Sequence, residues 1–358
     1  LVSGETHERF VAGFRCADFD GVAQHVLLKR NLGTRQDRGF EESLWFPSSH
    51  ISSVPDYWEN DYFDDVYSQN GKRDRQKGYC TEVFFEKAET WMQECIAASE
   101  PFLTFLPTNA PHAPLWVPAE DREFMEAAFA KGEHLLPHLT EELRERIIRF
   151  LAMIRNVDTQ IGELRSFLKE QDVERNTILI FMTDNGSTFG ETYYNAGMRG
   201  RKAQLWEGGH RVPFFIHWPN GELGDPRGIE GLTQVQDILP TLMEFCGLER
   251  SPGLKLDGMS LAPILRGETQ VPEKRTLVVN YSRMPNALDY PTPDSPSIMR
   301  REGAGVLWQR WRLLEGTELY DLENDPEQER DVAEQYPDIV SQLEEHLDTS
   351  VEKLIYLD

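Results

Sequence analysis

The amino-acid sequence predicts an α/β fold in which helices sandwich a mainly parallel sheet. Apolar residues recur every three or four positions over residues 141–170, as in a long helix packed on a sheet. A continuous apolar run follows at 177–182, which is typical of a strand covered on both faces. A further apolar strand is expected at 212–216. This alternation of helix and buried strand is characteristic of mainly parallel sheets.

The same patterns place elements nearer the amino end. Apolar spacing predicts an amphipathic helix over residues 81–98, and residues 102–106 read as a short buried strand. Residues 1–78 are rich in turn formers with little periodicity, so we expect long surface loops there. On the 141–170 helix, Asp158 falls on the predicted apolar stripe, where a buried carboxylate is more often structural than functional. That stripe comprises Ile147, Leu151, Ile154, Ile161, Leu164 and Leu168.

The character of the chain changes beyond residue 273. A short helix at 240–247 and an apolar turn at 261–265 precede the change. The patterns then predict strands at 276–280, 306–314 and 318–322, a hairpin at Glu315-Gly316-Thr317, and a closing helix at 336–354. We therefore expect a core domain over residues 1–272, with 1–28 unassigned, and a small α+β subdomain over 273–358.

The charge balance restricts the partners of the chain. The sequence has 61 Asp and Glu against 37 Lys and Arg, for a formal net charge of -24. Such a chain repels nucleic acid and anionic membranes, so we expect neither as a partner. It has no apolar run long enough to span a membrane. An anionic small substrate would require a local group of cations or a metal ion.

Two polar segments follow predicted strands and are candidates for a site. Asp184 and Asn185 come directly after the 177–182 strand and offer the oxygen ligands that calcium or magnesium prefers, although Asp-Asn-Gly is also a common turn. His112 lies in a proline-rich loop after the 102–106 strand. There it could transfer a proton or serve a structural role. In an α/β sheet both loops leave the carboxyl ends of strands, where ligands bind.

A basic cluster follows the Asp184 segment. It lies among several glycines, which allow the backbone to approach a ligand closely. The cluster suits an anion, and a solvated basic loop paired with surface acids is the alternative. Its members are Arg199, Arg201, Lys202 and Arg211.

The four cysteines, Cys16, Cys80, Cys95 and Cys246, form no CxxC pair. We interpret them as small, buried apolar residues rather than zinc ligands. Two disulfides among them would allow three connectivities, which the sequence does not distinguish.

The order of the motifs resembles the sulfatase family. The main motifs are Pro111-His112-x-Pro114, Thr183-Asp184-Asn185-Gly186, and Lys202 followed by Trp206-Glu207-Gly208-Gly209-x-Arg211-Val212-Pro213. Supporting segments are Gln36-Asp37-Arg38-Gly39-Phe40, Gln236-Asp237-Ile238-Leu239-Pro240-Thr241, and Glu318-Leu319-Tyr320-Asp321-Leu322-Glu323-Asn324-Asp325-Pro326. The resemblance extends from about Gln36 to the carboxyl terminus.

The resemblance implies an alkaline-phosphatase-like α/β core that hydrolyses sulfate esters through a formylglycine nucleophile. Asp184 and Asn185 would hold Ca2+ or Mg2+, while His112 and Lys202 would contact the sulfate and act in catalysis. Lys29 is a weaker substrate-binding candidate, because Lys29-Arg30-Asn31-Leu32-Gly33 resembles the Lys-Trp-His-Leu-Gly motif of the family. An exported or periplasmic location is implied, although no signal peptide is visible. Oligomeric state is not indicated.

The sequence departs from the family pattern at its amino end. It has no Cys/Ser-x-Pro/Ala-x-Arg nucleophile motif and no amino-terminal pair of metal-binding aspartates, and Asn31 replaces the histidine of the family motif. We therefore expect an amino-terminally truncated sulfatase, through a fragment, a frameshift or a misjoined segment, and no turnover by the chain alone. The alternatives are a non-catalytic relative that binds sulfated glycans through His112 and Lys202, and a phosphate or phosphonate ester hydrolase of the same superfamily.

Overall fold

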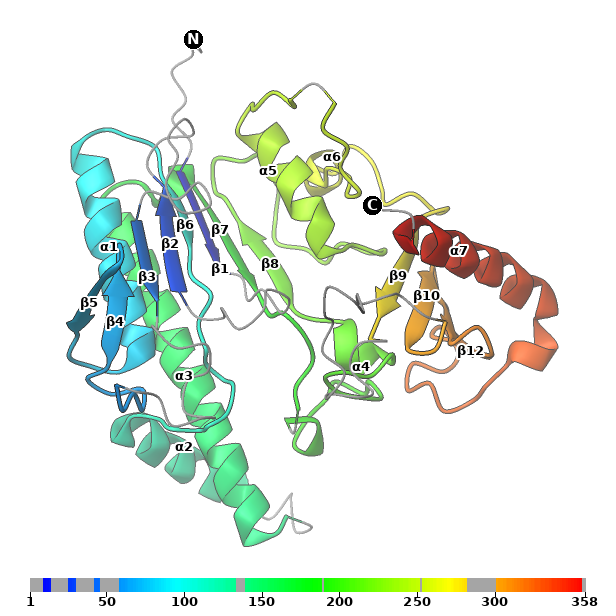
Figure 1. Ribbon diagram of the computed structural model, residues 1–358, viewed down its shortest axis with the longest axis horizontal. Helices are drawn as coiled ribbons and strands as arrows, with labels where there is room; N and C mark the ends of the chain where they lie inside the picture. Colours follow the sequence, from blue (N-terminus) through cyan, green and yellow to red (C-terminus); the bar gives the residue numbers. More distant parts are fainter. Residues whose placement is uncertain are drawn as a thin grey trace. The chain divides into compact units, whose positions relative to one another are not determined.

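A computed structural model of the chain describes residues 9–13, 25–29, 42–45, 58–132, 139–188, 190–251, 253–281 and 301–355 (Figure 1). The chain divides into two compact units. The first comprises residues 1–184 and 213–221, and the second comprises residues 185–212 and 222–358. Each unit has its own sheet, so each is described by itself below.

The sheet of the first unit contains eight described strands in the order β5-β4-β3-β2-β6-β1-β7-β8. The strands are β1 (Arg9–Gly13), β2 (His25–Lys29), β3 (Glu42–Trp45), β4 (Val66–Gln69), β5 (Lys72–Arg75), β6 (Leu103–Phe105), β7 (Thr177–Met182) and β8 (Phe214–His217). Strand β1 pairs in parallel with β6 on one side and β7 on the other. Because β6 and β7 are both parallel to β1, their carboxyl ends lie at the same edge of the sheet.

The α/β class is confirmed, with parallel pairing at the centre of the sheet. The described strands outside β6, β1 and β7 pair antiparallel, as seen for β2 with β6 and β8 with β7. The prediction of long loops over residues 1–78 was wrong, since five strands begin in that segment. All five have only four or five residues. Strand β5 reads Lys-Arg-Asp-Arg and is exposed along its length, so neither an apolar run nor alternation marks it.

Among the described residues of this unit, the α-helices are α1 (Cys80–Ala97), α2 (Ala119–Gly132) and α3 (Glu141–Glu170) (Figure 1). Helices α1 and α3 were predicted within a residue of their ends, whereas α2 was not predicted. On α1, the side chains of Phe84, Trp91 and Met92 are buried together with Leu164 and Leu168 of α3. Each large apolar side chain buried in this way contributes about 1.5–3 kcal/mol. The interface between α1 and α3 therefore forms much of the core of the unit.

In the middle of α3, the prediction of which side of the helix is buried was wrong. Ile154 is 40% exposed and Asp158 is exposed, whereas Asn156 and Gln160 are buried. The reason is a polar contact: the Asn156 Nδ2 donates to Asp121 Oδ2 of α2 at 2.9 Å and to Glu82 Oε1 of α1 at 3.0 Å. The buried amide nitrogen of Asn156 thus has two carboxylate acceptors, so a polar position can face the neighbouring helices here.

The second unit contains a four-stranded antiparallel sheet in the order β12-β11-β10-β9. Its elements are α4 (Glu207–His210), α5 (Ile238–Phe245), α6 (Ala262–Leu265), β9 (Thr276–Asn280), β10 (Ala304–Trp308), β11 (Trp311–Leu314), β12 (Glu318–Asp321) and α7 (Pro337–Ile355). The predicted hairpin and closing helix are confirmed. Leu343 and Leu347 of α7 are fully buried with Val306 and Leu313 of the sheet.

The Gln236–Thr241 segment has a structural role in this unit. The Asp237 carboxylate is fully buried and accepts hydrogen bonds from Gln234 N and Met259 N, both at 2.9 Å. Both of its oxygens lie 2.8 Å from Arg275 Nη2. A buried carboxylate paired and bonded in this way ties α5 to the segments around residues 259 and 275.

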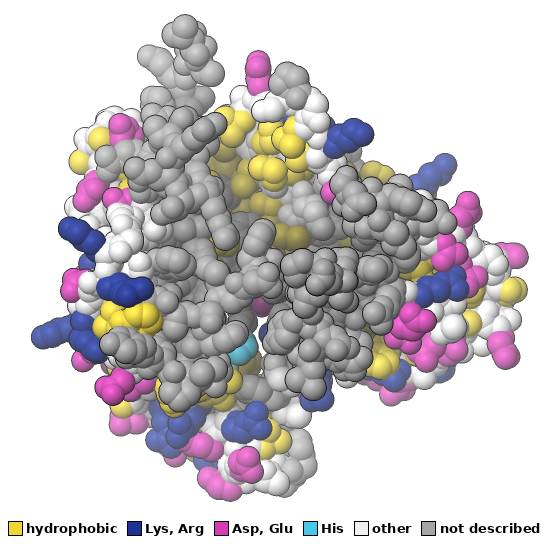
Figure 2. Space-filling model, viewed as in Figure 1, with side chains coloured by type: hydrophobic (Ala, Val, Ile, Leu, Met, Phe, Trp, Pro, Cys, Tyr) yellow, Lys and Arg dark blue, Asp and Glu magenta, His cyan; other side chains and the backbone are white. Residues whose placement is uncertain are grey.

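The surface carries both signs of charge and some apolar area. Figure 2 shows acidic and basic side chains interspersed around α2, and hydrophobic side chains gathered over α5. Leu239 of α5 and Val235, which precedes α5, are more than half exposed. None of the helices in the described part of the chain combines the length and apolar character that crossing a membrane requires.

The α1–α3 interface predicts a pH-dependent stability. Burial, followed by the charges of Glu163 and Glu86, raises the pKa of Glu89 from 4.5 to about 7. The folded state therefore holds the proton more tightly than the unfolded chain, so stability falls as pH rises from about 4.5 through 7. We expect Glu89→Gln to raise Tm by a few degrees at pH 8 and to have little effect at pH 4.

Thermal unfolding followed by circular dichroism between pH 4 and 8 measures this effect. Glu170→Gln is the matched control, because Glu170 is exposed at the end of α3. Glu170→Gln should change Tm at pH 8 by less than Glu89→Gln does. An equal pH dependence for both variants would contradict the account of Glu89.

Candidate functional site

His112 lies in the loop that follows β6, on a locally fixed backbone. Its N–H donates to Asn109 O at 2.8 Å. Asn109 is fully buried, and its Oδ1 accepts a hydrogen bond from Cys80 Sγ at 3.3 Å. Burial raises the pKa of the Cys80 thiol, so the thiol keeps its proton and remains a donor. The backbone that carries His112 is thereby tied to the first turn of α1.

The His112 imidazole is exposed, and its Nδ1 is hydrogen-bonded to Ala113 O. Because a carbonyl oxygen only accepts, Nδ1 carries a proton in this arrangement. This suits the predicted role of His112 in proton transfer or in donating to a substrate oxygen.

Asp184 lies two residues after β7, at the edge of the sheet from which the His112 loop also leaves β6. The predicted sharing of one edge by these two loops is confirmed within the first unit. Asp184 is half-buried. Asn185 follows it in the chain and is the first residue of the second unit. The Asn185 Nδ2 donates to Gly186 O at 3.0 Å, which leaves its Oδ1 as the oxygen suited to a cation.

The segment from Asn185 to Val212 is held together by its own backbone. Gly186 N donates to Gly209 O at 3.0 Å, and Lys202 N donates to Ser187 O at 3.1 Å. Lys202 and Asn185 are therefore connected within the second unit through one short stretch of chain. A Cβ added at Gly186 would lie 1.7 Å from the carbonyl oxygen of Gly208. Only glycine permits this approach, which accounts for the glycine in the Asp184 motif.

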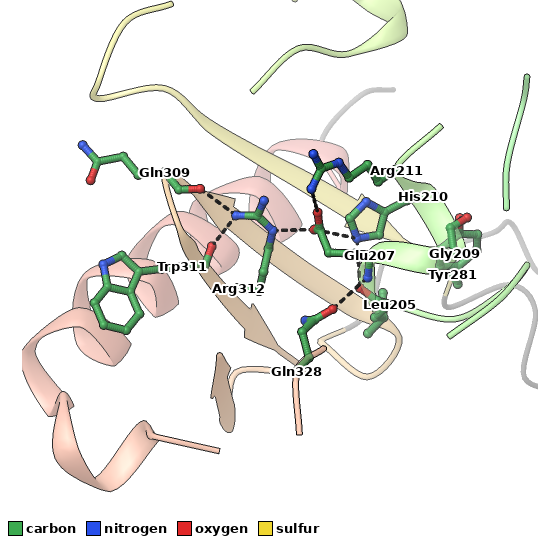
Figure 3. Close-up of polar contacts among 10 residues, drawn as sticks. All are labelled: Leu205, Glu207, Gly209, His210, Arg211, Tyr281, Gln309, Trp311, Arg312 and Gln328. Atoms are coloured by element: carbon green, nitrogen blue, oxygen red, sulfur yellow. Dashed lines mark hydrogen bonds and ion pairs between the residues drawn. The ribbon is translucent and has the colours of Figure 1, made fainter. Parts of the chain in front are cut away.

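Glu207 anchors this segment to the antiparallel sheet (Figure 3). Its carboxylate is 2% exposed, and its Oε1 lies 2.7 Å from Arg312 Nε on β11. The backbone N of Glu207 donates to Gln328 Oε1 at 2.8 Å. Burial by itself would raise the pKa of Glu207, but Arg312, with smaller contributions from His210 and Arg211, holds it below its usual range. The pair is therefore charged at neutral pH.

His210 has a structural role in the same network. Its Nε2 is hydrogen-bonded to Leu205 O at 3.0 Å, and its Nε2 lies 3.9 Å from Glu207 Oε1 (Figure 3). Burial lowers the pKa of His210, although Glu207 opposes that effect. The hydroxyl of Tyr281 donates to Gly209 O at 3.1 Å. Both contacts fix α4, which follows the Lys202 loop.

The arginines of the predicted basic cluster are engaged in structural contacts. Arg199 Nη1 donates to Gln328 O at 2.6 Å, and its guanidinium lies 4.2 Å from the centre of the Trp206 ring. Arg201 pairs with Glu191 at 3.3 Å, and Arg211 pairs with Glu207 at 3.4 Å. Arg201 and Arg211 thus pair with carboxylates, as the paired-loop alternative expected, whereas Arg199 contacts a backbone carbonyl and an aromatic ring. Lys202, the lysine of the predicted cluster, is half-buried.

Several candidates fall wholly or partly outside the described residues. Lys29 is the last residue of β2, but only its backbone is described and its side chain is not. Asn31, the segment 36–40 and Cys16 also lie outside the described residues. Cys80 and Cys95 are buried, as predicted, and Cys246 is partly buried; among the described residues none of the three forms a disulfide.

The chemistry of Asp184 and Asn185 fits a hard cation such as Ca2+ or Mg2+, which binds carboxylate and amide oxygens. They supply two such oxygen donors in succession. Within the described residues there is no group of three or more His, Cys, Asp or Glu side chains placed to hold a metal ion.

Comparisons with known proteins identify the class. The fold is that of a solved protein, Ps i-CgsB in complex with a neocarrahexaose, with a TM-score of 0.70 at 20% identity, covering 97% of this chain and 72% of that one. A family model described as sulfatase matches residues 21–248. A second, described as the carboxyl-terminal part of N-sulphoglucosamine sulphohydrolase, matches residues 201–353. The chain belongs to the sulfatase family.

Two curated relatives show how much of a sulfatase the chain spans. It is 28% identical over 250 residues to the uncharacterized sulfatase YdeN of Escherichia coli, covering 69% of this chain and 40% of YdeN. It is 25% identical over 312 residues to an arylsulfatase of Klebsiella aerogenes, covering 64% of this chain and 67% of that enzyme. The chain thus spans about half the length of these relatives.

Sequence reasoning did not assign functions to Glu207, Arg312 and Gln328. Glu207 was visible as part of the Trp206 motif, but its partner is 105 residues away, and no local pattern joins the two. Gln328 lies two residues after the Glu318–Pro326 segment. Its nearness to a family motif was the signal that could have pointed to it. The tertiary structure shows that both partners meet α4.

The close approach at Gly186 predicts a sharp effect of adding one methyl group. We expect Gly186→Ala to lower the free energy of unfolding by about 3 kcal/mol, because the Gly208 backbone would have to move. Gly228→Ala is the control, since nothing lies within 4 Å of a Cβ there. It should leave stability unchanged or raise it by up to about 1 kcal/mol. Urea unfolding of both variants measures the difference, and similar stabilities would refute the clash.

Two substitutions around Glu207 compare how much a buried and an exposed arginine partner each contribute to stability. Arg312→Met removes the buried partner of the Glu207 carboxylate, so we expect a loss of about 3–5 kcal/mol at pH 7. Arg211→Met removes a partner of the same carboxylate whose side chain is 68% exposed, so a loss under about 1 kcal/mol is expected.

Chemical denaturation at pH 7 compares these two variants. The wild-type pair should weaken as pH falls through the lowered pKa of Glu207, and the Arg312→Met variant should lack that acid-dependent part. Equal losses for the two arginine variants would show that burial does not set the strength of the interaction.

Proposed function

We propose that this protein acts on sulfate esters and that the full-length protein is an arylsulfatase-like sulfuric ester hydrolase. The observation that carries the proposal is the placement of His112 and Asp184 at one edge of the first-unit sheet, in a chain that belongs to the sulfatase family. Lys202 and Asn185 add a cation and an amide oxygen from a single glycine-fixed segment.

Each residue has a proposed role. Lys202 binds the sulfate oxygens, and His112 donates to the ester or bridging oxygen through Nε2. Asp184 and Asn185 hold Ca2+ or Mg2+, which when bound neutralises negative charge on the sulfate. A chain with a formal charge of -24 needs such local positive charge to accept an anion. Lys29 is retained as a weaker candidate for substrate binding on family resemblance alone.

The nucleophile is the part that these 358 residues do not provide. The sequence has no Cys/Ser-x-Pro/Ala-x-Arg motif from which a formylglycine would form, and Asn31 cannot accept a proton as the family histidine does. We therefore propose that this polypeptide binds a sulfate ester without cleaving it. A relative that binds sulfated glycans without turnover is the alternative that this same departure favours. The solved protein Ps i-CgsB holds a neocarrahexaose, which supports a glycan as the ligand.

Binding and turnover of 4-nitrophenyl sulfate test this proposal. We expect calorimetry to detect binding that requires Ca2+ and weakens about tenfold in Lys202→Ala. Lys255→Ala, which removes an exposed lysine of the same unit, should bind as the wild type does. No nitrophenol should be released. Calcium-dependent release that is abolished by Asp184→Ala would overturn the proposed inactivity, and binding unaffected by Lys202→Ala would overturn the assigned role of that lysine.

A further inference from the structure

The first unit contains a cavity that the roles proposed above do not use. Its volume is about 300 Å3, at the lower end of the range of about 300–1,000 Å3 found for small-molecule sites. It lies beside the loop that carries His112, because Trp116 and Val117 belong to that loop. The lining residues are Asp61, Phe63, Trp116, Val117, Arg122 and Arg149.

Two aromatic rings are presented to this cavity on a fixed support. Trp116 is 37% exposed and Phe63 is 39% exposed. The Trp116 ring packs edge-on against the ring of Tyr62, with 5.8 Å between ring centres. The backbone carbonyl of Trp116 accepts a hydrogen bond from Tyr79 Oη at 3.0 Å. Phe63 packs against the ring of Tyr79 at 5.2 Å. Tyr62 and Tyr79 are buried, so the exposed rings rest on core residues.

The loop that carries Asp61 and Phe63 is held in a costly backbone conformation. Tyr62 has a φ of 79° and Asp64 a φ of 53°, a region that side chains other than glycine rarely adopt. The buried Asp65 carboxylate fixes the loop by accepting from Asp61 N at 2.8 Å and Tyr62 N at 2.9 Å. Strain that is held in place by such bonds is concentrated at binding sites.

The polar groups of the cavity are balanced in charge. Arg122 and Arg149 are about two-fifths exposed, and both contact the Glu145 carboxylate, at 3.1 and 2.7 Å. Arg122 also pairs with Glu126 at 3.6 Å. With Asp61, three carboxylates oppose two guanidinium groups, so the cavity offers no excess of positive charge for an anion.

Hydrogen-bonding capacity nevertheless remains in the cavity. Arg149 contacts Glu145 through Nε, so its two terminal amino groups are available as donors. Asp61 Oδ1 accepts from Phe63 N at 3.2 Å, and its second oxygen remains as an acceptor. A donor and an acceptor on the wall of an aromatic-lined cavity match the hydroxyl groups and the C–H face of a pyranose ring.

We infer that this cavity binds an uncharged sugar ring of a glycan. Trp116 and Phe63 contact the C–H faces of the ring, while Asp61 and Arg149 bind its hydroxyls. This inference deepens the proposed function, on which it rests for the glycan as ligand, by naming recognition of an unsulfated ring of that glycan. The sugar site consists entirely of first-unit residues.

Binding of neutral tetrasaccharides tests the inference without requiring turnover. Neoagarotetraose, cellotetraose and chitotetraose are titrated into the wild-type chain and followed by saturation-transfer NMR and calorimetry. We expect at least one to bind with a Kd of about 1 mM or below. Trp116→Ala and Arg149→Met should each weaken binding about tenfold, because each removes a group that contacts the ring. Phe215→Ala, which removes a 63% exposed ring of the same unit outside the cavity, should not.

Competition distinguishes this site from the sulfate site. Sodium sulfate should leave tetrasaccharide binding unchanged, and Lys202→Ala should do the same. Displacement by sulfate would show an anion site and overturn the inference, as would tighter binding of adenosine than of any sugar. Absence of binding for all three tetrasaccharides, or equal binding by the wild type, Trp116→Ala and Arg149→Met, would also overturn it. If Trp116→Ala fails to fold, Arg149→Met alone decides, since Arg149 is half-exposed.

Discussion

The buried ion pair between Glu207 and Arg312 is the interaction on which the second unit depends. It joins the glycine-rich segment that carries Asn185 and Lys202 to an antiparallel sheet more than a hundred residues further along the chain. Charges removed from water cost several kcal/mol each, and here the cost is offset by mutual attraction and by neighbours such as Arg211 and His210. The segment is thus fixed by burial rather than by regular secondary structure. A loop positioned in this way can hold two candidate ligand-binding side chains in a constant relation.

A different constraint organises the first unit. Strand β1 lies between β6 and β7 and is parallel to both, so the loops bearing His112 and Asp184 leave the same edge of the sheet. The Cys80 thiol and Asn109 then fix the backbone before His112. The cavity beside the His112 loop is supported by buried residues in the same way, because the buried rings of Tyr62 and Tyr79 contact the exposed rings of Trp116 and Phe63. Rigid support for exposed polar or aromatic groups is what a binding site requires.

The sequence predicted an element well where its apolar pattern continued without interruption along the whole element. Helix α3 and strand β7 were located from their patterns, whereas the exposed strand β5 and the helix α2 were not. The phase error at Asp158 has a physical cause, since Asn156 is buried by hydrogen bonds that a count of apolar residues cannot register. The sequence left open whether the arginines beside Lys202 bind an anion or form a paired loop, and the structure shows each of Arg199, Arg201 and Arg211 in a structural contact.

The sequence by itself determined the family, the α/β class and the residues that form the candidate sulfate site, because motifs are local and their side-chain chemistry is fixed by residue type. It also determined that the family nucleophile motif is absent from these 358 residues. Only the tertiary structure decided which charges are paired, which aromatic rings are exposed, and that Asp61, Trp116 and Arg149 line one cavity. These properties depend on contacts between segments far apart in the chain, and burial, which sets the strength of each contact, is not a property of any single segment.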